Sequence, residues 1–467
     1  MHPASASAPT EISRGVRRAI LSHSDLIHIG MDSRGASIDW SYPSVPNFNI
    51  LFQGGSGAGK TYTIQNMAAE IHNRGTTLHI VDIKGDFSHS EFVNSGLGHK
   101  VSGEDFNDIV FNYTLEGSAL NPLQVPRTED GGGVLQTIGV VRELVKIFNP
   151  NAGVKQLNYL THVLKDVYAN AGIEHDDPTT WANPSPTFKD VLSHIELIFD
   201  ALTAGSDITT VQDIYKSLGT AKKQAKAAIE KLKAAGEADH TISEKVAEIR
   251  DTLESNLIDH ARRLVSFEAL TKRRTSKSAE WEQWSKETLY GLKSIIEEMV
   301  DSRLFTGNLS RPRAGKLNRY VLTDLNARHQ QIIMRIIAAQ VFAMGIMETK
   351  RNNSFNPSFP SHILVADEGK HIKEISASPI DPFNRIGTEG RGYGVGVWCG
   401  VQQPDQVTKD LLKNFATYFL LKVPEASYAE VAKLFGTKPA QLRQLVPREN
   451  CLFGTGGAYS LVNHFRA

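Results

Sequence analysis

The sequence predicts an α/β fold in which a mostly parallel β-sheet is flanked by helices and interrupted by a large helical segment. Three observations lead to this prediction. An apolar run at 48–52 is followed by a glycine-rich turn and then by a helical pattern at 64–71. Alternation of strand and helix patterns resumes at Asn318. Between about 185 and 300, alanine, lysine and glutamate become frequent and strand patterns are absent, which is typical of an inserted helical region.

These patterns divide the chain into four predicted parts. A Pro/Ala/Ser-rich arm opens the chain, and the short strand patterns Leu26–Ile29 and Ser37–Trp40 flank a turn signal, which predicts a β-hairpin. The predicted parts are an N-terminal arm with a short β region (1–45), the first part of the α/β core (46–184), an α-helical insertion (185–300), and the second part of the core with a C-terminal tail (301–467).

The glycine-rich turn has the sequence Gly-Gly-Ser-Gly-Ala-Gly-Lys-Thr, from Gly54 to Thr61. This is the P-loop pattern, in which backbone N–H groups surround a phosphate at the start of a helix. Lys60 is expected to reach the β- and γ-phosphates, and the Thr61 hydroxyl is expected to join a Mg²⁺ shell. The motif therefore predicts ATP and Mg²⁺ as ligands. The expected nucleotide contacts are Gly55, Gly57, Ala58, Gly59, Lys60, Thr61 and Tyr62.

A second apolar run, Ile363–Ala366, leads directly into Asp367 and Glu368. Two carboxylates at the end of a buried strand downstream of a P-loop have a specific use. Asp367 is expected to hold the Mg²⁺ together with Thr61, and Glu368 to act as the base that polarises the attacking water. A base at this position favours hydrolysis over mere binding.

Other polar residues follow predicted strands. The run Thr77–Asp82 ends at Asp82, and Asp86 comes four residues later. These two carboxylates either line the nucleotide site or belong to a plain loop, and both alternatives stay open. Gln402 follows the predicted strand at 395–401, where it is placed to sense the γ-phosphate. Arg391 lies just before that strand and is a candidate arginine finger, with a surface arginine in a glycine-rich turn as the alternative.

The predicted helical insertion contains two apolar stripes at helical spacing. The longer stripe predicts a helix of some 25 residues, and a shorter one precedes it, with a turn near Gly236. Residues 216–277 carry 14 basic against 9 acidic side chains, and Lys272-Arg273-Arg274 with Lys277 is the densest basic point. Contact with the phosphate backbone of DNA and a simple solvated helical face are the two interpretations. The longer stripe is formed by Ile242, Val246, Ile249, Leu253, Leu257, Ala261 and Leu264, and the shorter by Ala221, Ala225, Ile229 and Leu232.

The composition limits the classes of protein that fit the sequence, but it does not indicate a binding partner. Basic and acidic residues balance at 51 each, so any basic surface is local. Two cysteines, Cys399 and Cys451, cannot build a disulfide framework or a zinc site. No uninterrupted apolar run reaches the ~18–20 residues of a membrane span. We therefore expect a cytoplasmic protein with no membrane partner.

The motifs taken together resemble the HerA–FtsK superfamily of P-loop motor ATPases, on its HerA-like branch. The resemblance covers about 45–125 and 315–455, and its most discriminating part is Glu-Gly-Arg-x-Tyr-Gly-Val-Gly before a strand that ends in Gln-x-Pro. The matching segments are Gly54–Thr61, Val81–Asp86, Leu322–Leu325, Leu364–Glu368, Glu389–Gly396 and Gln402–Pro404.

The resemblance implies a RecA-like core that assembles into a hexameric ring and translocates or unwinds double-stranded DNA. It assigns Lys60 and Thr61 to Walker A, and Asp367 and Glu368 to Walker B. Gln402 matches the sensor glutamine and Arg391 the arginine finger, with Arg385 as a weaker second candidate. It also implies a helicase-type motor that powers a partner nuclease or another effector, in DNA processing or in antiviral (phage) defence.

The sequence departs from that family at three points. Gln403 stands where arginine is usual, and Lys84 where histidine is common. The region before the P-loop, about 45 residues, is too short for the N-terminal β-barrel of many HerA-like proteins, which puts docking of a nuclease through it in doubt. Two other functions share the core motifs. One is a conjugation- or secretion-type ATPase that moves DNA or protein at a membrane channel, and the other is a nucleotide switch or scaffold.

Overall fold

The computed structural model describes residues 25–113, 121–125, 133–204, 208–264, 284–305, 312–367, 371–373, 381–455 and 457–463. The predictions for Glu368, for the basic cluster at 272–277 and for the N-terminal arm fall outside these residues. The chain forms two compact units. One comprises 1–120, 129–131 and 306–467, and the other 121–128 and 132–305. They are called the sheet unit and the helical unit below.

The sheet unit is built on an 11-stranded sheet in the order β2-β1-β11-β10-β9-β3-β8-β7-β4-β6-β5. All neighbours from β9 to β5 are parallel, which confirms the predicted mostly parallel sheet. Its parallel strands are β3 (Ile50–Gln53), β4 (Thr77–Asp82), β5 (Phe106–Val110), β6 (Leu317–Val321), β7 (His362–Ala366), β8 (Val395–Val401) and β9 (Thr417–Leu420).

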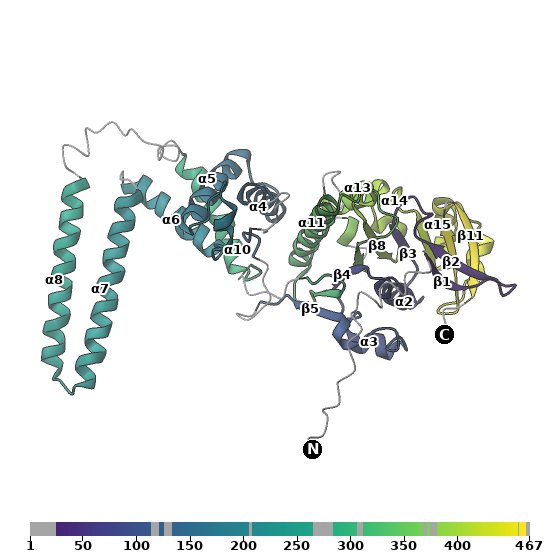
Figure 1. Cartoon of the computed structure of the whole chain (residues 1–467), viewed down its shortest axis with the longest axis horizontal. Helices are drawn as coiled ribbons and strands as arrows, with labels where there is room; N and C mark the ends of the chain where they lie inside the picture. Colours follow the sequence, from purple (N-terminus) through teal and green to yellow (C-terminus); the bar gives the residue numbers. More distant parts are fainter. Residues whose placement is uncertain are drawn as a thin grey trace, which may run out of the picture. The chain divides into compact units, whose positions relative to one another are not determined.

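Helices cover both faces of this parallel region. Every residue of β3, β4, β6, β7 and β8 is buried, as expected for strands packed between two helical layers. Right-handed crossovers that run along the sheet in opposite directions put their helices on opposite faces. Accordingly, α2 (Lys60–Asn73) lies on one side of the strands in Figure 1, and α11 (Ala327–Asn352) with α13 (Pro382–Glu389) on the other. The shorter helices are α3 (His89–Asn94), α14 (Lys409–Leu412), α15 (Tyr428–Phe435) and α16 (Pro439–Arg443).

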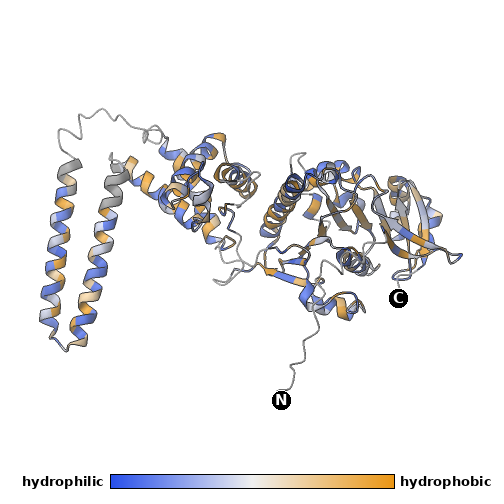
Figure 2. Cartoon of the chain, viewed as in Figure 1, coloured by the Kyte–Doolittle hydropathy of each residue, from blue (hydrophilic) through white to orange (hydrophobic). Residues whose placement is uncertain are grey.

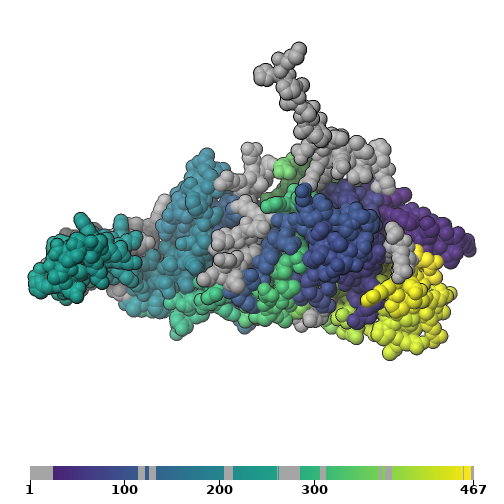
Figure 3. Space-filling view, turned by 90° about the horizontal axis from the view of Figure 1, so that it is seen from below, coloured from purple at the N-terminus to yellow at the C-terminus, as the bar shows by residue number. Residues whose placement is uncertain are grey.

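An antiparallel extension joins the two ends of the described chain. The predicted N-terminal hairpin is present as β1 (Leu26–Met31) and β2 (Ser37–Ser41). It continues the central sheet by pairing with β11 (Ala458–Asn463), which pairs in turn with β10 (Asn450–Thr455). Figure 3 shows the N-terminal strands (purple) beside the C-terminal region (yellow) on the surface. Within the described residues the hairpin is thus an extension of the sheet and not part of a separate barrel.

Helix α11 is the one helix, among the described residues, whose length and composition would allow it to cross a membrane. Its apolar 18-residue window has a mean hydropathy of 1.6, and 56% of that window is buried inside the protein. Ile333, Ile337 and Val341 are fully buried. Arg335 and Gln340 interrupt this window, so the prediction that no uninterrupted apolar run reaches the length of a membrane span is not contradicted.

The helical unit consists of α4 (Val134–Phe148), α5 (Val154–Asn170), α6 (Phe188–Ala204), α7 (Ile208–Ala234), α8 (Asp239–Leu264) and α10 (Lys286–Asp301). It begins near 121 and not at the predicted 185. The difference arises because α5 packs against α4, α6 and α10, with Leu160, Val163 and Leu164 fully buried. Composition alone changes only later in the chain, where the lysine-rich helices begin.

The predicted helical hairpin is α7 and α8, which run side by side in Figure 1. Gly236 forms the turn between them with a φ of 73°, a left-handed conformation that favours glycine. Helices α7 and α8 pack along each other, and Ile242 of the predicted α8 stripe is only 8% exposed. Val246, Ile249, Leu253 and Leu257 are partly buried, whereas Ala261 is exposed. Most other residues of the hairpin whose burial is described are exposed, and Figure 2 shows hydrophilic and hydrophobic residues mixed along both helices.

Candidate nucleotide site

The P-loop has the predicted strand–turn–helix geometry. Strand β3 ends at Gln53, the turn occupies 54–59, and α2 begins at Lys60. Gly57 and Gly59 have φ values of 72° and 103°, so glycine is required at both positions. The start of the turn is fixed by its neighbours, because the Gly54 N–H donates to the Val401 carbonyl at 3.0 Å.

The Lys60 ammonium folds back over this turn. Its Nζ donates to the carbonyl oxygens of Gly54 at 2.9 Å and Gly55 at 3.1 Å. The charge therefore lies on the loop itself, where an incoming phosphate would replace the carbonyls as its partner. Contact of Lys60 with the β- and γ-phosphates stays a prediction of the motif.

Thr61 and Asp367, 306 residues apart in the sequence, meet at the carboxyl edge of the sheet. The Thr61 hydroxyl donates to Asp367 Oδ2 at 2.8 Å. Burial raises the pKa of the Asp367 carboxyl to about 6, although the Thr61 hydroxyl and the charges of Lys60 and Lys84 oppose the shift. A nearby cation would offset that burial and stabilise the charged carboxylate.

The second oxygen of Asp367 supports the same conclusion. Oδ1 is buried and has no hydrogen-bond partner among the described residues. It lies against Gly400 of β8, where an added Cβ would stand 2.0 Å from it. Carboxylate and hydroxyl oxygens are the ligands that Mg²⁺ prefers, so Thr61 and Asp367 fit a magnesium ion bound beside the P-loop.

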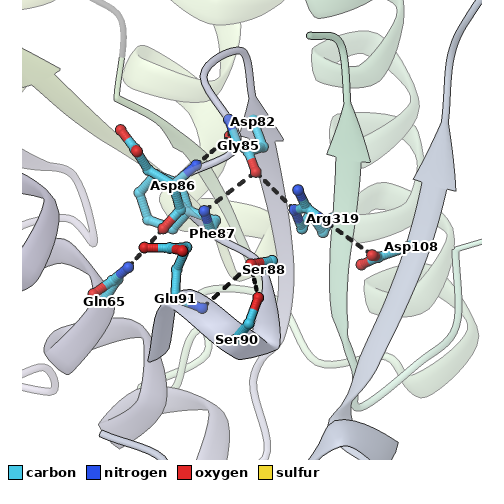
Figure 4. Close-up of polar contacts among 10 residues, drawn as sticks. All are labelled: Gln65, Asp82, Gly85, Asp86, Phe87, Ser88, Ser90, Glu91, Asp108 and Arg319. Carbon is cyan, nitrogen blue, oxygen red and sulfur yellow. Dashed lines mark hydrogen bonds and ion pairs between the residues drawn. The ribbon is translucent and has the colours of Figure 1, made fainter. Parts of the chain in front are cut away.

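Asp82 has a structural role at the end of β4. Its carboxylate accepts hydrogen bonds from the backbone N–H groups of Gly85 (2.7 Å), Asp86 (3.1 Å) and Phe87 (3.2 Å). Arg319 of β6 donates to it at 2.7 Å and also contacts Asp108 at 2.8 Å. Figure 4 shows this network, in which both oxygens of Asp82 are engaged.

The Asp82 network bears on the two alternatives for the loop after β4. Asp82 is only 1% exposed and its oxygens are used within the protein, so it shapes the loop and leaves no oxygen for a ligand. Lys84 and Asp86 act electrostatically on Asp367, and both line a small pocket together with Asp367 and Asp82. The loop thus contributes to the site through these two residues.

Gln402 and Arg391 lie at opposite ends of strand β8. Gln402 follows the carboxyl end of β8, and its carbonyl accepts from Gln53 Nε2 at 2.7 Å, at the edge where the P-loop begins. Arg391 precedes the amino end of β8, with its guanidinium 4.3 Å from the centre of the Phe48 ring. Because β8 has seven residues, roughly 20 Å separates the two edges. Arg391 therefore cannot reach the P-loop of its own chain.

The surroundings of the two arginine candidates differ. Arg391 is partly buried, its Nη1 has no hydrogen-bond partner among the described residues, and burial lowers the pKa of its guanidinium. Arg385 of α13 is more exposed and pairs with Glu389 at 3.2 Å. It also lies over the Phe342 ring at 4.6 Å. Both candidates lie before the amino end of β8.

Two further residues complete the site. Tyr62, a predicted nucleotide contact, packs partly against the hydrophobic core of the sheet unit. Arg448, which no sequence pattern indicated, touches the P-loop directly: its N–H donates to the Ala58 carbonyl at 3.2 Å. Only long-range packing brings Arg448 there, because it lies in a polar turn nearly 400 residues after the motif.

Neither a protein-family model nor a curated protein sequence matches the chain. Among solved structures, the chain is similar to VirB4 of Thermoanaerobacter pseudethanolicus, with 16% identity over 94% of this chain and 96% of that one, at a TM-score of 0.56. The bacterial conjugative coupling protein TrwB in an unbound form gives 12% identity over 97% and 91%, at a TM-score of 0.48. The plasmid coupling protein TrwB in complex with ADP and Mg²⁺ gives 13% identity over 98% and 94%, at 0.47.

The likeness to VirB4 is one of fold. It shows that the chain has the RecA-like P-loop fold, a large mostly parallel sheet flanked by helices, as the sequence predicted. The similarity extends over nearly the whole chain and thus includes the helical unit. The narrower HerA-like assignment has no support from these likenesses and stays a prediction of the motifs.

Proposed function

We propose that this protein is a Mg²⁺-dependent ATPase that translocates DNA. The observation that carries the proposal is the hydrogen bond from the Thr61 hydroxyl to Asp367 at 2.8 Å. It lies beside a P-loop whose lysine, Lys60, is hydrogen-bonded to the loop itself. A phosphate-binding turn next to paired oxygen ligands for a divalent ion is the arrangement needed to bind and hydrolyse a nucleoside triphosphate.

Each residue then has a defined task. The backbone N–H groups of the P-loop and Lys60 hold the phosphates, while Thr61 and Asp367 hold the Mg²⁺. The bound ion supplies charge neutralisation at the β- and γ-phosphates. Glu368, which follows Asp367 directly in the sequence, orients the attacking water and accepts its proton. Gln402 stands at the same sheet edge, where its amide senses the γ-phosphate.

A ring assembly follows from the position of Arg391. An arginine finger at the amino edge of the sheet cannot serve its own P-loop, so it must act on the P-loop of a neighbouring copy. Head-to-tail contacts form a ring when the rotation from one copy to the next closes. We propose the homohexamer that the family resemblance implies, with Arg391 at each boundary and Arg385 as the alternative.

The partner that we propose is double-stranded DNA, with α7 as one contact surface. Between residues 214 and 234 this helix carries six exposed lysines and only one glutamate. Lys226 pairs with that glutamate, Glu230, at 3.9 Å. A row of lysines on an exposed helix suits the regularly spaced charges of a phosphate backbone. The lysines are Lys216, Lys222, Lys223, Lys226, Lys231 and Lys233.

Replacing Lys222 and Lys226 together by alanine is expected to weaken duplex binding. Each lysine that contacts a phosphate contributes about 0.9 to the slope of log K against log salt, so the slope should fall by about 2. Fluorescence anisotropy with a labelled duplex at several salt concentrations measures it. The matched control is Lys409→Ala with Lys413→Ala, an exposed pair at the same spacing in the sheet unit, which should leave the slope unchanged. Equal slopes for the wild type and the α7 variant would remove α7 from the DNA interface.

A second candidate function uses the same site, namely a conjugation- or secretion-type ATPase at a membrane channel. The N-terminal hairpin favours it over a nuclease-coupled motor, because among the described residues the hairpin extends the sheet and does not form a docking barrel. Co-fractionation with membranes would support this candidate. A cytoplasmic location together with a co-purifying nuclease or other effector would support the motor in DNA processing or defence.

ATP hydrolysis by the purified protein tests the proposal. We expect turnover that requires Mg²⁺ and is stimulated by duplex DNA, and a hexamer by light scattering when an ATP analogue and DNA are present. A protein that stays monomeric and whose hydrolysis ignores DNA would contradict the translocase. Stimulation by single-stranded DNA alone would favour the second candidate.

A further inference from the structure

Arg448 adopts an uncommon backbone conformation next to the nucleotide site. Its φ is 63°, in the left-handed region that side-chain-bearing residues rarely occupy. It lies in the exposed segment between α16 and β10. A non-glycine residue kept in this conformation costs free energy that the fold must offset, and such residues gather at functional sites. The question is what this arginine does there.

Among the described residues, the hydrogen bonds of Arg448 are with the P-loop. Its N–H donates to the Ala58 carbonyl at 3.2 Å, and its Nε approaches the Gly57 carbonyl at 3.4 Å. Its Cα lies 3.5 Å from the point where a Cβ on Gly59 would be, so the two backbones are closely packed. Arg448 therefore contacts the two consecutive peptide groups at the crest of the loop.

These two contacts determine which way the loop presents its donors. In a planar trans peptide the C=O and the following N–H point in opposite directions. When Arg448 holds the carbonyls of Gly57 and Ala58, the N–H groups of Ala58 and Gly59 are directed to the other side, where the Ala58 N–H donates to the Gly55 carbonyl at 3.3 Å. Successive N–H groups arranged in this way form the anion-binding concavity of a P-loop. The guanidinium also adds a positive charge at the rim of that concavity.

We propose that Arg448 is a positioning residue of the nucleotide site, which orients the crest of the P-loop of its own chain for phosphate binding. The proposal rests on the proposed function, because it requires the loop to bind a nucleotide. It gives the site a second arginine, distinct in place from Arg391: Arg448 acts within one chain at the carboxyl edge, whereas Arg391 is confined to the amino edge.

Replacing Arg448 by glycine separates this role from a merely structural one. Glycine keeps the N–H bond to Ala58 and removes the left-handed strain, so the thermal midpoint of the free protein should stay the same or rise. The loss of the guanidinium should nevertheless weaken binding of fluorescently labelled ADP by about tenfold, as expected for one hydrogen bond from a charged group. In turnover, KM for ATP should rise by a similar factor while kcat changes little.

A conservative exchange and a neighbouring arginine provide the controls. Arg448→Lys keeps the charge but not the Nε contact, and its ADP affinity should lie between those of the wild type and Arg448→Gly. Arg443→Ala removes an arginine five positions earlier whose guanidinium faces Glu425 at 3.8 Å, and it should bind ADP like the wild type.

The outcomes distinguish a failure of the positioning role of Arg448 from a failure of the proposed function. If the wild type binds ADP and Arg448→Gly binds it equally tightly, the positioning role is wrong and the proposed function stands. If Arg448→Gly loses affinity only in proportion to a lower thermal midpoint, the role is structural and the inference is overturned. If the wild type binds neither ADP nor ATP, the proposed function itself fails.

Discussion

Replacing Gly400 by alanine is expected to lower kcat for ATP hydrolysis by about 100-fold, the cost of displacing a positioned group by roughly 1 Å. The new Cβ would stand 2.0 Å from Asp367 Oδ1 and 3.0 Å from its Cα, so the carboxylate or the strand must move. Overpacking of this kind also lowers the free energy of unfolding by about 1–3 kcal/mol. Steady-state hydrolysis at saturating Mg²⁺ and a thermal unfolding curve measure both effects.

Gly219→Ala is the matched control for this substitution. Gly219 lies inside α7, and an added Cβ would meet nothing within 4 Å. Alanine at an exposed helical position should leave hydrolysis unchanged and stabilise the protein by about 0.5–1 kcal/mol. Wild-type kcat in Gly400→Ala would show that hydrolysis does not depend on the place that Asp367 occupies.

Arg319→Met is expected to lower the free energy of unfolding by about 3–5 kcal/mol, because it leaves a buried carboxylate without its cation. The Arg319 and Asp82 side chains are 10% and 1% exposed, and their atoms are 2.7 Å apart. The three backbone hydrogen bonds to Asp82 remain, but they no longer balance its charge. Urea-induced unfolding measures the loss.

Asp108→Asn removes the outer partner of the same arginine. The Asp108 side chain is 45% exposed, so this change should cost less than about 1 kcal/mol. A similar cost for the two variants would mean that the buried pair does not stabilise the sheet. Hydrolysis should also fall in Arg319→Met, since Asp82 holds the loop that brings Lys84 and Asp86 near Asp367.

Local sequence patterns were sufficient to predict the parallel sheet and the pairing of Thr61 with Asp367 in the nucleotide site. Buried runs that end in polar residues identify β4, β7 and β8, and parallel strands bring those ends to one edge. That is why Thr61 and Asp367 could be paired from the sequence although 306 positions separate them. The αα-hairpin was equally accessible, because its stripes and its turn at Gly236 are local signals.

Other features depend on packing that no local pattern encodes. The hairpin β1–β2 is a clear pattern, but its pairing with β11 joins the two ends of the described chain. Arg448 reaches the P-loop only because the segment before β10 folds back over it. Arg391 is an intermediate case: the direction of β8 separates it from Gln402, and its action on a neighbouring copy is a proposal.

The most direct test of the account is calorimetric titration of the protein with a non-hydrolysable ATP analogue in the presence of Mg²⁺. We expect one site per chain in the wild type. We also expect the loss of measurable binding in Lys60→Ala, and a much weaker dependence on Mg²⁺ in Asp367→Asn. Unchanged binding in Lys60→Ala, or no binding by the wild type, would contradict the central claim that the P-loop and Asp367 form a Mg·ATP site.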